Sequence, residues 1–185
     1  MLRHLQAVFA AGILLGACPA SALTVEKLLT EFRDGVYRVS FEAVLAAPPS
    51  KVAAILQDYS AYPSLDVRVR SSERLASEPG GAILVRTRIH ACEGLFCRTV
   101  TRVERVEAGP DSLVATVIPA LSQLRQGLTR TTWQAQDGGT RISYEAEFEP
   151  DFWVPEIIGR QFARHGLRDS TLELFSNVER YARGQ

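Results

Sequence analysis

Residues 128–182 read LTRTTWQAQDGGTRISYEAEFEPDFWVPEIIGRQFARHGLRDSTLELFSNVERYA. The runs 128–136 and 140–149 are typical of strands, and Asp137-Gly138-Gly139 between them is typical of a tight hairpin turn. From Val154 to about Ala182 the apolar residues recur at helical spacing instead. We therefore predict that an antiparallel sheet ends near residue 150 and that one long amphipathic helix follows it.

The chain upstream of this stretch adds more strands and a short helix. Residues 36–45 alternate between apolar and polar side chains, which is the pattern of a half-buried strand. Pro48-Pro49-Ser50 ends that strand, and an apolar stripe then predicts a helix that ends near Tyr59. Further strands are expected at about 67–76, 82–91, 97–107 and 112–118. Helical spacing within Leu23–Phe32 predicts a short helix ahead of the first strand.

This order of elements predicts an α+β fold. Successive strands joined by short turns have to be antiparallel, and they give a sheet of about seven strands. The long helix must bury its apolar stripe against one face of that sheet. We predict a curved antiparallel sheet wrapped around the C-terminal helix, in a single domain over residues 23–185. A closed eight-stranded barrel is the alternative, but it would leave the helical tail little to cover.

Composition and charge exclude one class of partner. With 46% apolar residues, the chain can form an ordinary globular core. Its 21 basic and 21 acidic residues give a formal net charge of zero, so there is no global field to attract nucleic acid. We therefore expect no nucleic-acid partner.

The N-terminus is typical of a secretory signal peptide. Arg3 supplies a positive charge, Leu5–Ala17 is an uncharged apolar run, and Ala20-Ser21-Ala22 is an A-x-A cleavage site. We predict that residues 1–22 are removed and that the mature protein lies in the periplasm.

A tetrapeptide inside this signal allows a second outcome. Leu15-Gly16-Ala17-Cys18 resembles a bacterial lipobox, whose cysteine is lipidated and retained as an anchor. In that alternative, Cys18 would hold the protein at the membrane. The complete A-x-A site favours the cleaved, unanchored form.

Cys92 and Cys97 form an even pair around a four-residue hairpin loop. Facing residues in a hairpin have Cα atoms roughly 4.5–5.5 Å apart, which a disulfide accepts. Because an oxidising compartment would let the bond form, we predict a disulfide that staples the hairpin. A metal pair or a redox dithiol is the alternative. We find no nearby His-Cys cluster to supply further ligands, and we expect no metal and no other cofactor.

Several stretches resemble one family. They are GVYRVSFEAVLAAP at 35–48, Lys51-Val52 with Asp58-Tyr59 and Tyr62-Pro63, Cys92 with Phe96-Cys97-Arg98, and EPDFWVPEIIG at 149–159. Together they resemble the START-like (SRPBCC) superfamily, in particular exported bacterial members of its polyketide cyclase/dehydrase and coenzyme Q-binding branch. The resemblance spans about residues 35–182. It implies a helix-grip fold with a cavity between sheet and helix for lipids, sterols, quinones or polyketides, but it does not imply one reaction.

The cysteine pair also sets the register of its hairpin, in which facing residues have numbers that sum to 189. The face predicted to be exposed carries Arg86, Arg88, His90, Thr99, Thr101 and Arg105. The inward face pairs Ile83 with Val106, Val85 with Glu104, Thr87 with Arg102, and Ile89 with Val100. Thr87, Arg102 and Glu104 would then form a polar floor that anchors a ligand head group. The alternative is that a bulge turns them into water.

Further candidates for ligand binding are aromatic side chains and one histidine. They are Tyr37, Phe41, Trp133, Tyr144, Phe148, Phe152, Trp153, Phe162 and His165. Core packing is the alternative for any of the aromatic residues, and Phe152-Trp153 could also fasten the start of the helix to the sheet. For His165, the alternative is a satisfied core histidine.

These features favour a binding or carrier protein for a lipid, quinone or isoprenoid type of molecule. The sequence shows no evident nucleophile constellation or phosphate loop, so we predict no catalytic residues and do not favour an enzyme. A cyclase or dehydratase using Arg102, Glu104 or His165 is one alternative, and an envelope interaction protein without a ligand is another. The expected partner is a hydrophobic small molecule. Membrane contact is expected only through a lipidated Cys18 or during ligand exchange.

Overall fold

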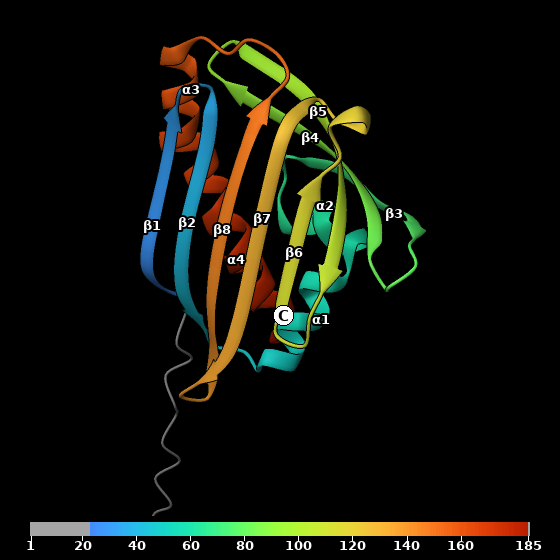
Figure 1. Cartoon of the computed structure of the whole chain (residues 1–185). Helices are drawn as coiled ribbons and strands as arrows, with labels where there is room; N and C mark the ends of the chain where they lie inside the picture. The colour runs from blue at the N-terminus through green and yellow to red at the C-terminus, as the bar shows by residue number, and fades with distance from the viewer. Residues whose placement is uncertain (1–22, 185) are drawn as a thin grey trace, which may run out of the picture.

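The computed structural model describes residues 23–184 and shows one curved, eight-stranded sheet around a C-terminal helix (Figure 1). The strands are β1 (Thr24–Arg33), β2 (Val36–Leu45), β3 (Val69–Ser77), β4 (Ile83–Glu93), β5 (Phe96–Ala108), β6 (Ser112–Val117), β7 (Leu124–Gln136) and β8 (Gly139–Pro150). Their order in the sheet is β1-β2-β8-β7-β6-β5-β4-β3, and all neighbours are antiparallel. The predicted helix-grip fold is confirmed. The predicted signal peptide and Cys18 lie outside the described residues.

The predicted helix over 23–32 is wrong, because this segment is strand β1. Asp34 and Gly35 both have positive φ, at 53° and 82°, and form a tight two-residue connection that folds β1 back onto β2. Along β1, Leu28, Thr30 and Phe32 are half-buried or buried, whereas the residues between them are exposed. This period of two is that of a strand, and it raises the strand count from about seven to eight.

The C-terminal helix has three parts. They are α3 (Glu156–Phe162), a π-helical turn η3 (Ala163–Leu167) and α4 (Arg168–Ala182). In Figure 1, α4 lies across the inner face of the sheet, and α3 lies beyond it beside the end of β1. A Cβ on Gly159 would lie 2.3 Å from the Phe32 ring, so glycine allows α3 to approach β1 closely. The predicted single helix from residue 154 is thus interrupted by one π turn and begins at Glu156.

Short helices close the opposite end of the sheet. They are α1 (Pro49–Gln57), the 3₁₀ turn η1 (Tyr59–Ala61) and α2 (Tyr62–Leu65). A separate 3₁₀ turn, η2 (Pro119–Leu121), follows β6. Both α1 and α2 pack against α4. The main core lies between α4 and the sheet, where the Phe41 and Phe175 rings stack with centroids 4.7 Å apart. No helix within residues 23–184 is long and apolar enough to cross a membrane.

Candidate ligand cavity

A cavity of about 260 Å³ lies between the inner face of the sheet, the α1–α2 region and the C-terminal helix. Eight of the residues predicted to bind a ligand lie in its wall, namely Tyr37, Thr87, Arg102, Glu104, Tyr144, Phe148, Phe152 and Phe162. Apolar side chains such as Val85, Ile89 and Val106 make up much of the remaining wall. The structure therefore brings eight of the predicted residues around one cavity, and their contact with a ligand stays a prediction.

The predicted register of the β4–β5 hairpin is confirmed. Cys92 pairs with Cys97 and Thr87 pairs with Arg102, and no bulge interrupts this pair of strands. The predicted disulfide is present, with Cys92 and Cys97 joined across the hairpin. Of the side chains predicted to point inward, all except Ile83 line the cavity, and Thr87, Arg102 and Glu104 are among them. The alternative in which a bulge turns Arg102 and Glu104 into water is therefore excluded.

Arg102 and Glu104 form an ion pair in the cavity wall. Arg102 Nε lies 3.0 Å from Glu104 Oε2, and the two side chains are 24% and 7% exposed. The contact lacks hydrogen-bond geometry, so the buried Nε of Arg102 has no hydrogen-bond partner among residues 23–184. Buried polar groups usually are hydrogen-bonded, because an unmade bond costs about 1–3 kcal/mol. The pair is thus a polar patch, and the protein leaves part of the hydrogen-bonding capacity of this patch unused.

Two tyrosines lie near this polar patch. The Tyr62 hydroxyl donates to the backbone oxygen of Leu56 at 2.8 Å. Burial raises the pKa of Tyr144, while the nearby Arg102 lowers it and Glu104 raises it. Burial likewise raises the pKa of Tyr62. Both phenols therefore stay protonated at neutral pH, and they can act as hydrogen-bond donors but not as phenolate bases.

Aromatic rings line the end of the cavity near α3. Tyr37 stacks on Phe148 with ring centroids 5.1 Å apart, and it meets the edge of Phe162 at 5.7 Å. Desolvation by burial raises the pKa of Tyr37 to about 12. Arg98 from β5 lies over the Phe152 ring, 3.9 Å from its centroid. This contact joins the β4–β5 hairpin to the connection between β8 and α3.

The structure places the other four predicted residues elsewhere. Phe41 and Trp133 are buried in the main core and do not line the cavity, so they follow the core-packing alternative. Trp153 is 80% exposed, although its neighbour Phe152 lines the cavity. The His165 side chain is 61% exposed, and its Nδ1 lies 4.0 Å from Glu93 Oε1. His165 is outside the cavity, which removes it from the acid–base candidates.

Part of the cavity wall and one cluster of metal-ligand atoms were not predicted from the sequence. Tyr59, Tyr62 and Phe96 line the cavity, although only the family resemblance pointed to these positions. On the hairpin's outer face, His90 Nε2 lies 3.5 Å from Cys92 Sγ. The expectation that no His-Cys cluster lies near the cysteine pair is therefore wrong. The spacing of His90 and Cys92 could have indicated this cluster, because residues i and i+2 lie on the same face of a strand.

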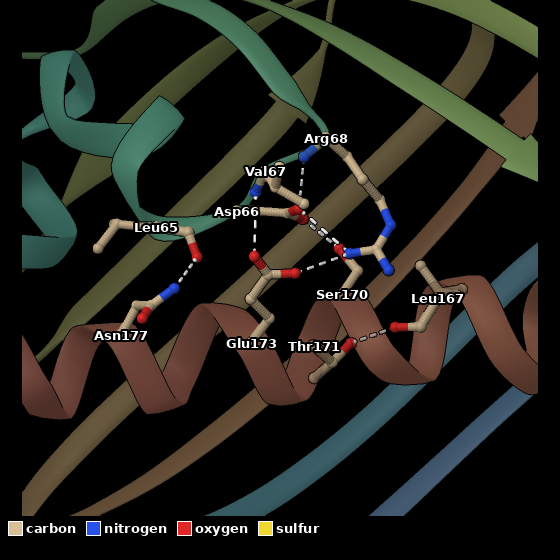
Figure 2. A network of polar contacts seen from close by, with 9 residues as sticks. All are labelled: Leu65, Asp66, Val67, Arg68, Leu167, Ser170, Thr171, Glu173 and Asn177. Carbon is tan, nitrogen blue, oxygen red and sulfur yellow. Dashed lines mark hydrogen bonds and ion pairs between the residues drawn. The ribbon is translucent and has the colours of Figure 1, made fainter.

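A polar network fixes the cavity wall between α2 and α4 (Figure 2). The buried Asp66 carboxylate accepts hydrogen bonds from the Arg68 backbone N–H at 2.9 Å and from the Ser170 hydroxyl. Glu173 accepts from the Val67 N–H at 3.2 Å and pairs with Arg68, also at 3.2 Å. Asp66, Arg68 and Ser170 all line the cavity. The network therefore holds the segment before β3 against α4.

Replacing Asp66 with alanine should lower the free energy of unfolding by about 2 kcal/mol, because buried donors lose their acceptor. Asp151, an exposed aspartate, provides the matched control, and its replacement with alanine should change stability by less than about 0.5 kcal/mol. Urea denaturation of both variants measures the difference. Equal stability of the two variants would show that the network does not hold this segment.

A curved sheet around a C-terminal helix, with a largely apolar cavity between them, defines a protein of the helix-grip class. Residues 37–182 match the family model described as polyketide cyclase / dehydrase and lipid transport, and the chain belongs to that family. No curated protein matches the sequence.

Solved structures show the same fold at low sequence identity. A START superfamily protein from Mycobacterium smegmatis is 17% identical, with a TM-score of 0.63, over 78% of this chain and 98% of that one. The Zhui aromatase/cyclase from Streptomyces sp. R1128 is 16% identical, with a TM-score of 0.64, over 80% of this chain and 94% of that one. A STAR-related lipid transfer protein from Xanthomonas axonopodis is 14% identical, with a TM-score of 0.60, over 88% and 99%.

Proposed function

We propose that this protein binds or carries a hydrophobic small molecule of lipid, quinone or isoprenoid type in the cavity between its sheet and its C-terminal helix. The family includes lipid transport in its description, and one structural neighbour is a lipid transfer protein. A helix-grip protein without this role could fill its interior with side chains, whereas this interior retains a cavity of about 260 Å³. That size suits a compact ligand, because typical ligand pockets measure roughly 300–1,000 Å³.

The observation that carries the proposal is the Arg102–Glu104 ion pair in a cavity wall that is apolar over most of its area. The two charges cancel, so the patch favours a neutral group over an ion. A carboxylate accepts hydrogen bonds and a guanidinium donates them, so a hydroxyl or carbonyl at one end of the ligand could use either partner. The Tyr144 phenol adds a further donor close to the pair. The proposed ligand is therefore an apolar body with one neutral polar end.

Replacing Arg102 with methionine should weaken binding of a ligand that has this polar end by about tenfold, because a hydrogen bond to a charged group contributes roughly 1.5–3 kcal/mol. Geraniol and the hydrocarbon myrcene are suitable probes, since only geraniol carries a hydroxyl. Displacement of the fluorescent probe N-phenyl-1-naphthylamine measures both affinities. Binding of myrcene should be unchanged.

Arg86→Met is the control, because Arg86 lies on the outer face of the same hairpin and pairs with Glu73 at 3.2 Å. The double variant R102M/E104L removes both charges and leaves no unpaired carboxylate in the wall. It should keep its affinity for myrcene and lose the preference for geraniol. Unchanged geraniol binding in both Arg102 variants would contradict the role of the pair.

A cyclase or dehydratase is the second candidate. It is favoured by the convergence of Arg102, Glu104 and Tyr144 in one cavity, and one structural neighbour is an aromatase/cyclase. Glu104 would be the acid–base group, because the tyrosines stay protonated and His165 lies outside. Recovery of a bound ligand chemically unchanged after long incubation supports carriage, whereas its conversion, abolished in Glu104→Gln, supports catalysis.

We further propose that the protein acts in the periplasm. The disulfide between Cys92 and Cys97 supports an oxidising compartment, since such bonds are rare in the cytosol. Lipid anchoring through Cys18 is the alternative. The mass of the protein purified from a bacterial envelope fraction distinguishes cleavage after Ala22 from lipidation of Cys18.

A further inference from the structure

Three side chains on the outer face of the β4–β5 hairpin bring metal-ligand atoms together. They belong to His90, Cys92 and Cys97, and all of their ligand atoms lie within 4.8 Å of one another. His90 and Cys92 share one face of β4, and Cys97 faces Cys92 from β5. Because the cysteines are exposed and His90 is half-buried, solvent and ions can reach the cluster.

A neighbouring hydroxyl orients the imidazole of His90. Thr99 is the residue directly opposite His90, and its Oγ1 lies 3.0 Å from His90 Nδ1. When Nδ1–H donates to this hydroxyl, the lone pair of Nε2 is free on the side of Cys92. Metal-binding histidines usually donate their second N–H to such an oxygen, which fixes the tautomer and the ring.

The distances fit a tetrahedral metal ion. With metal–nitrogen bonds near 2.0–2.1 Å and metal–sulfur bonds near 2.3 Å, a tetrahedral angle puts nitrogen and sulfur about 3.6 Å apart. The observed distance between His90 Nε2 and Cys92 Sγ is 3.5 Å. Two sulfurs on the same ion would be about 3.8 Å apart. Binding therefore requires the disulfide to be open and the sulfurs to separate, which rotation of the exposed side chains allows.

We propose that the dithiol form of the hairpin binds a thiophilic cation such as Zn²⁺ through His90 Nε2, Cys92 Sγ and Cys97 Sγ, with water as a fourth ligand. A dithiol reductant supplies the two electrons and two protons by exchange, and is itself oxidised to a disulfide. The cation then displaces the two thiol protons and binds both thiolates. The hairpin thus has two mutually exclusive cross-links, a disulfide or a metal ion.

Cobalt(II) titration tests this site, because thiolate ligands give cobalt a charge-transfer absorption and a tetrahedral site gives it strong visible bands. The full chain carries Cys18→Ser in every sample, is reduced with a phosphine, and is titrated without oxygen. We expect one cobalt per chain in the reduced parent and none in the oxidised parent. His90→Ala should weaken binding at least tenfold, and C92S/C97S should abolish it.

Two further variants separate the site from general effects. Thr99→Val should weaken cobalt binding by about tenfold if the hydroxyl orients His90, and Thr99→Ser should restore it. His165→Ala, which removes an exposed histidine outside the cluster, should bind like the parent. The proposal is overturned if the reduced parent shows no thiolate–cobalt absorption, or if His90→Ala binds cobalt as tightly as the parent.

Discussion

Tryptophan in place of Ala115 is expected to abolish ligand binding while the fold persists. Ala115 lies on β6 and lines the cavity, half-buried between its strand neighbours Val106 and Thr129. An indole at this position projects into a cavity of about 260 Å³ and takes the space that the ligand needs. We therefore expect affinity for N-phenyl-1-naphthylamine to fall by about 100-fold or more, equivalent to roughly 2.7 kcal/mol.

The control for this variant is Ala135→Trp, since Ala135 is an exposed residue of β7. It introduces the same indole into a neighbouring strand and should leave the affinity unchanged. Circular dichroism shows whether Ala115→Trp keeps its secondary structure, because overpacking can destabilise a core by about 1–3 kcal/mol. A folded Ala115→Trp protein that binds the probe as tightly as the parent would show that the ligand lies elsewhere.

Replacing Phe175 with alanine should lower the free energy of unfolding by about 3–5 kcal/mol. Phe175 is fully buried on α4, stacks on Phe41 and meets the edge of Tyr144 with ring centroids 5.3 Å apart. Its removal leaves a void where the helix is held on the sheet, and it also costs the aromatic contacts. A shift of this size is a large fraction of the stability of an ordinary domain.

Denaturation in urea measures this loss, and Ser176→Ala, at the exposed neighbouring position on α4, is the control. The control should stay within about 0.5 kcal/mol of the parent. A loss below about 1 kcal/mol in Phe175→Ala would mean that α4 is not fastened to the sheet through this stack.

Turn chemistry explains why most of the fold was predictable. Asp137-Gly138 gives the β7–β8 hairpin, and the cysteine pair fixed the register of β4 with β5 residue by residue. In β1, the positions Val25, Leu28, Leu29 and Phe32 also fit a helix, so the short apolar pattern was ambiguous. The tight Asp34-Gly35 connection decides for a hairpin, because it pairs β1 directly with β2. The π turn at 163–167 has no comparable signal.

The candidate site was predictable where strand alternation decides the face. Thr87, Arg102 and Glu104 follow from the hairpin register, and all three line the cavity. Phe41 also points inward, but the position of Phe175 makes it core rather than cavity wall. That outcome depends on where α4 packs, which no local pattern specifies. Phe152 and Trp153 separate for a similar reason, since the irregular connection to α3 turns only one of them inward.

Native mass spectrometry of the protein purified from its native source tests most directly whether the cavity holds a hydrophobic molecule. We expect a non-covalent added mass of one small molecule per chain, which disappears after extraction with organic solvent and is absent from Ala115→Trp. A protein that carries no added mass, and that takes up neither geraniol, myrcene nor N-phenyl-1-naphthylamine when they are supplied, would contradict the claim.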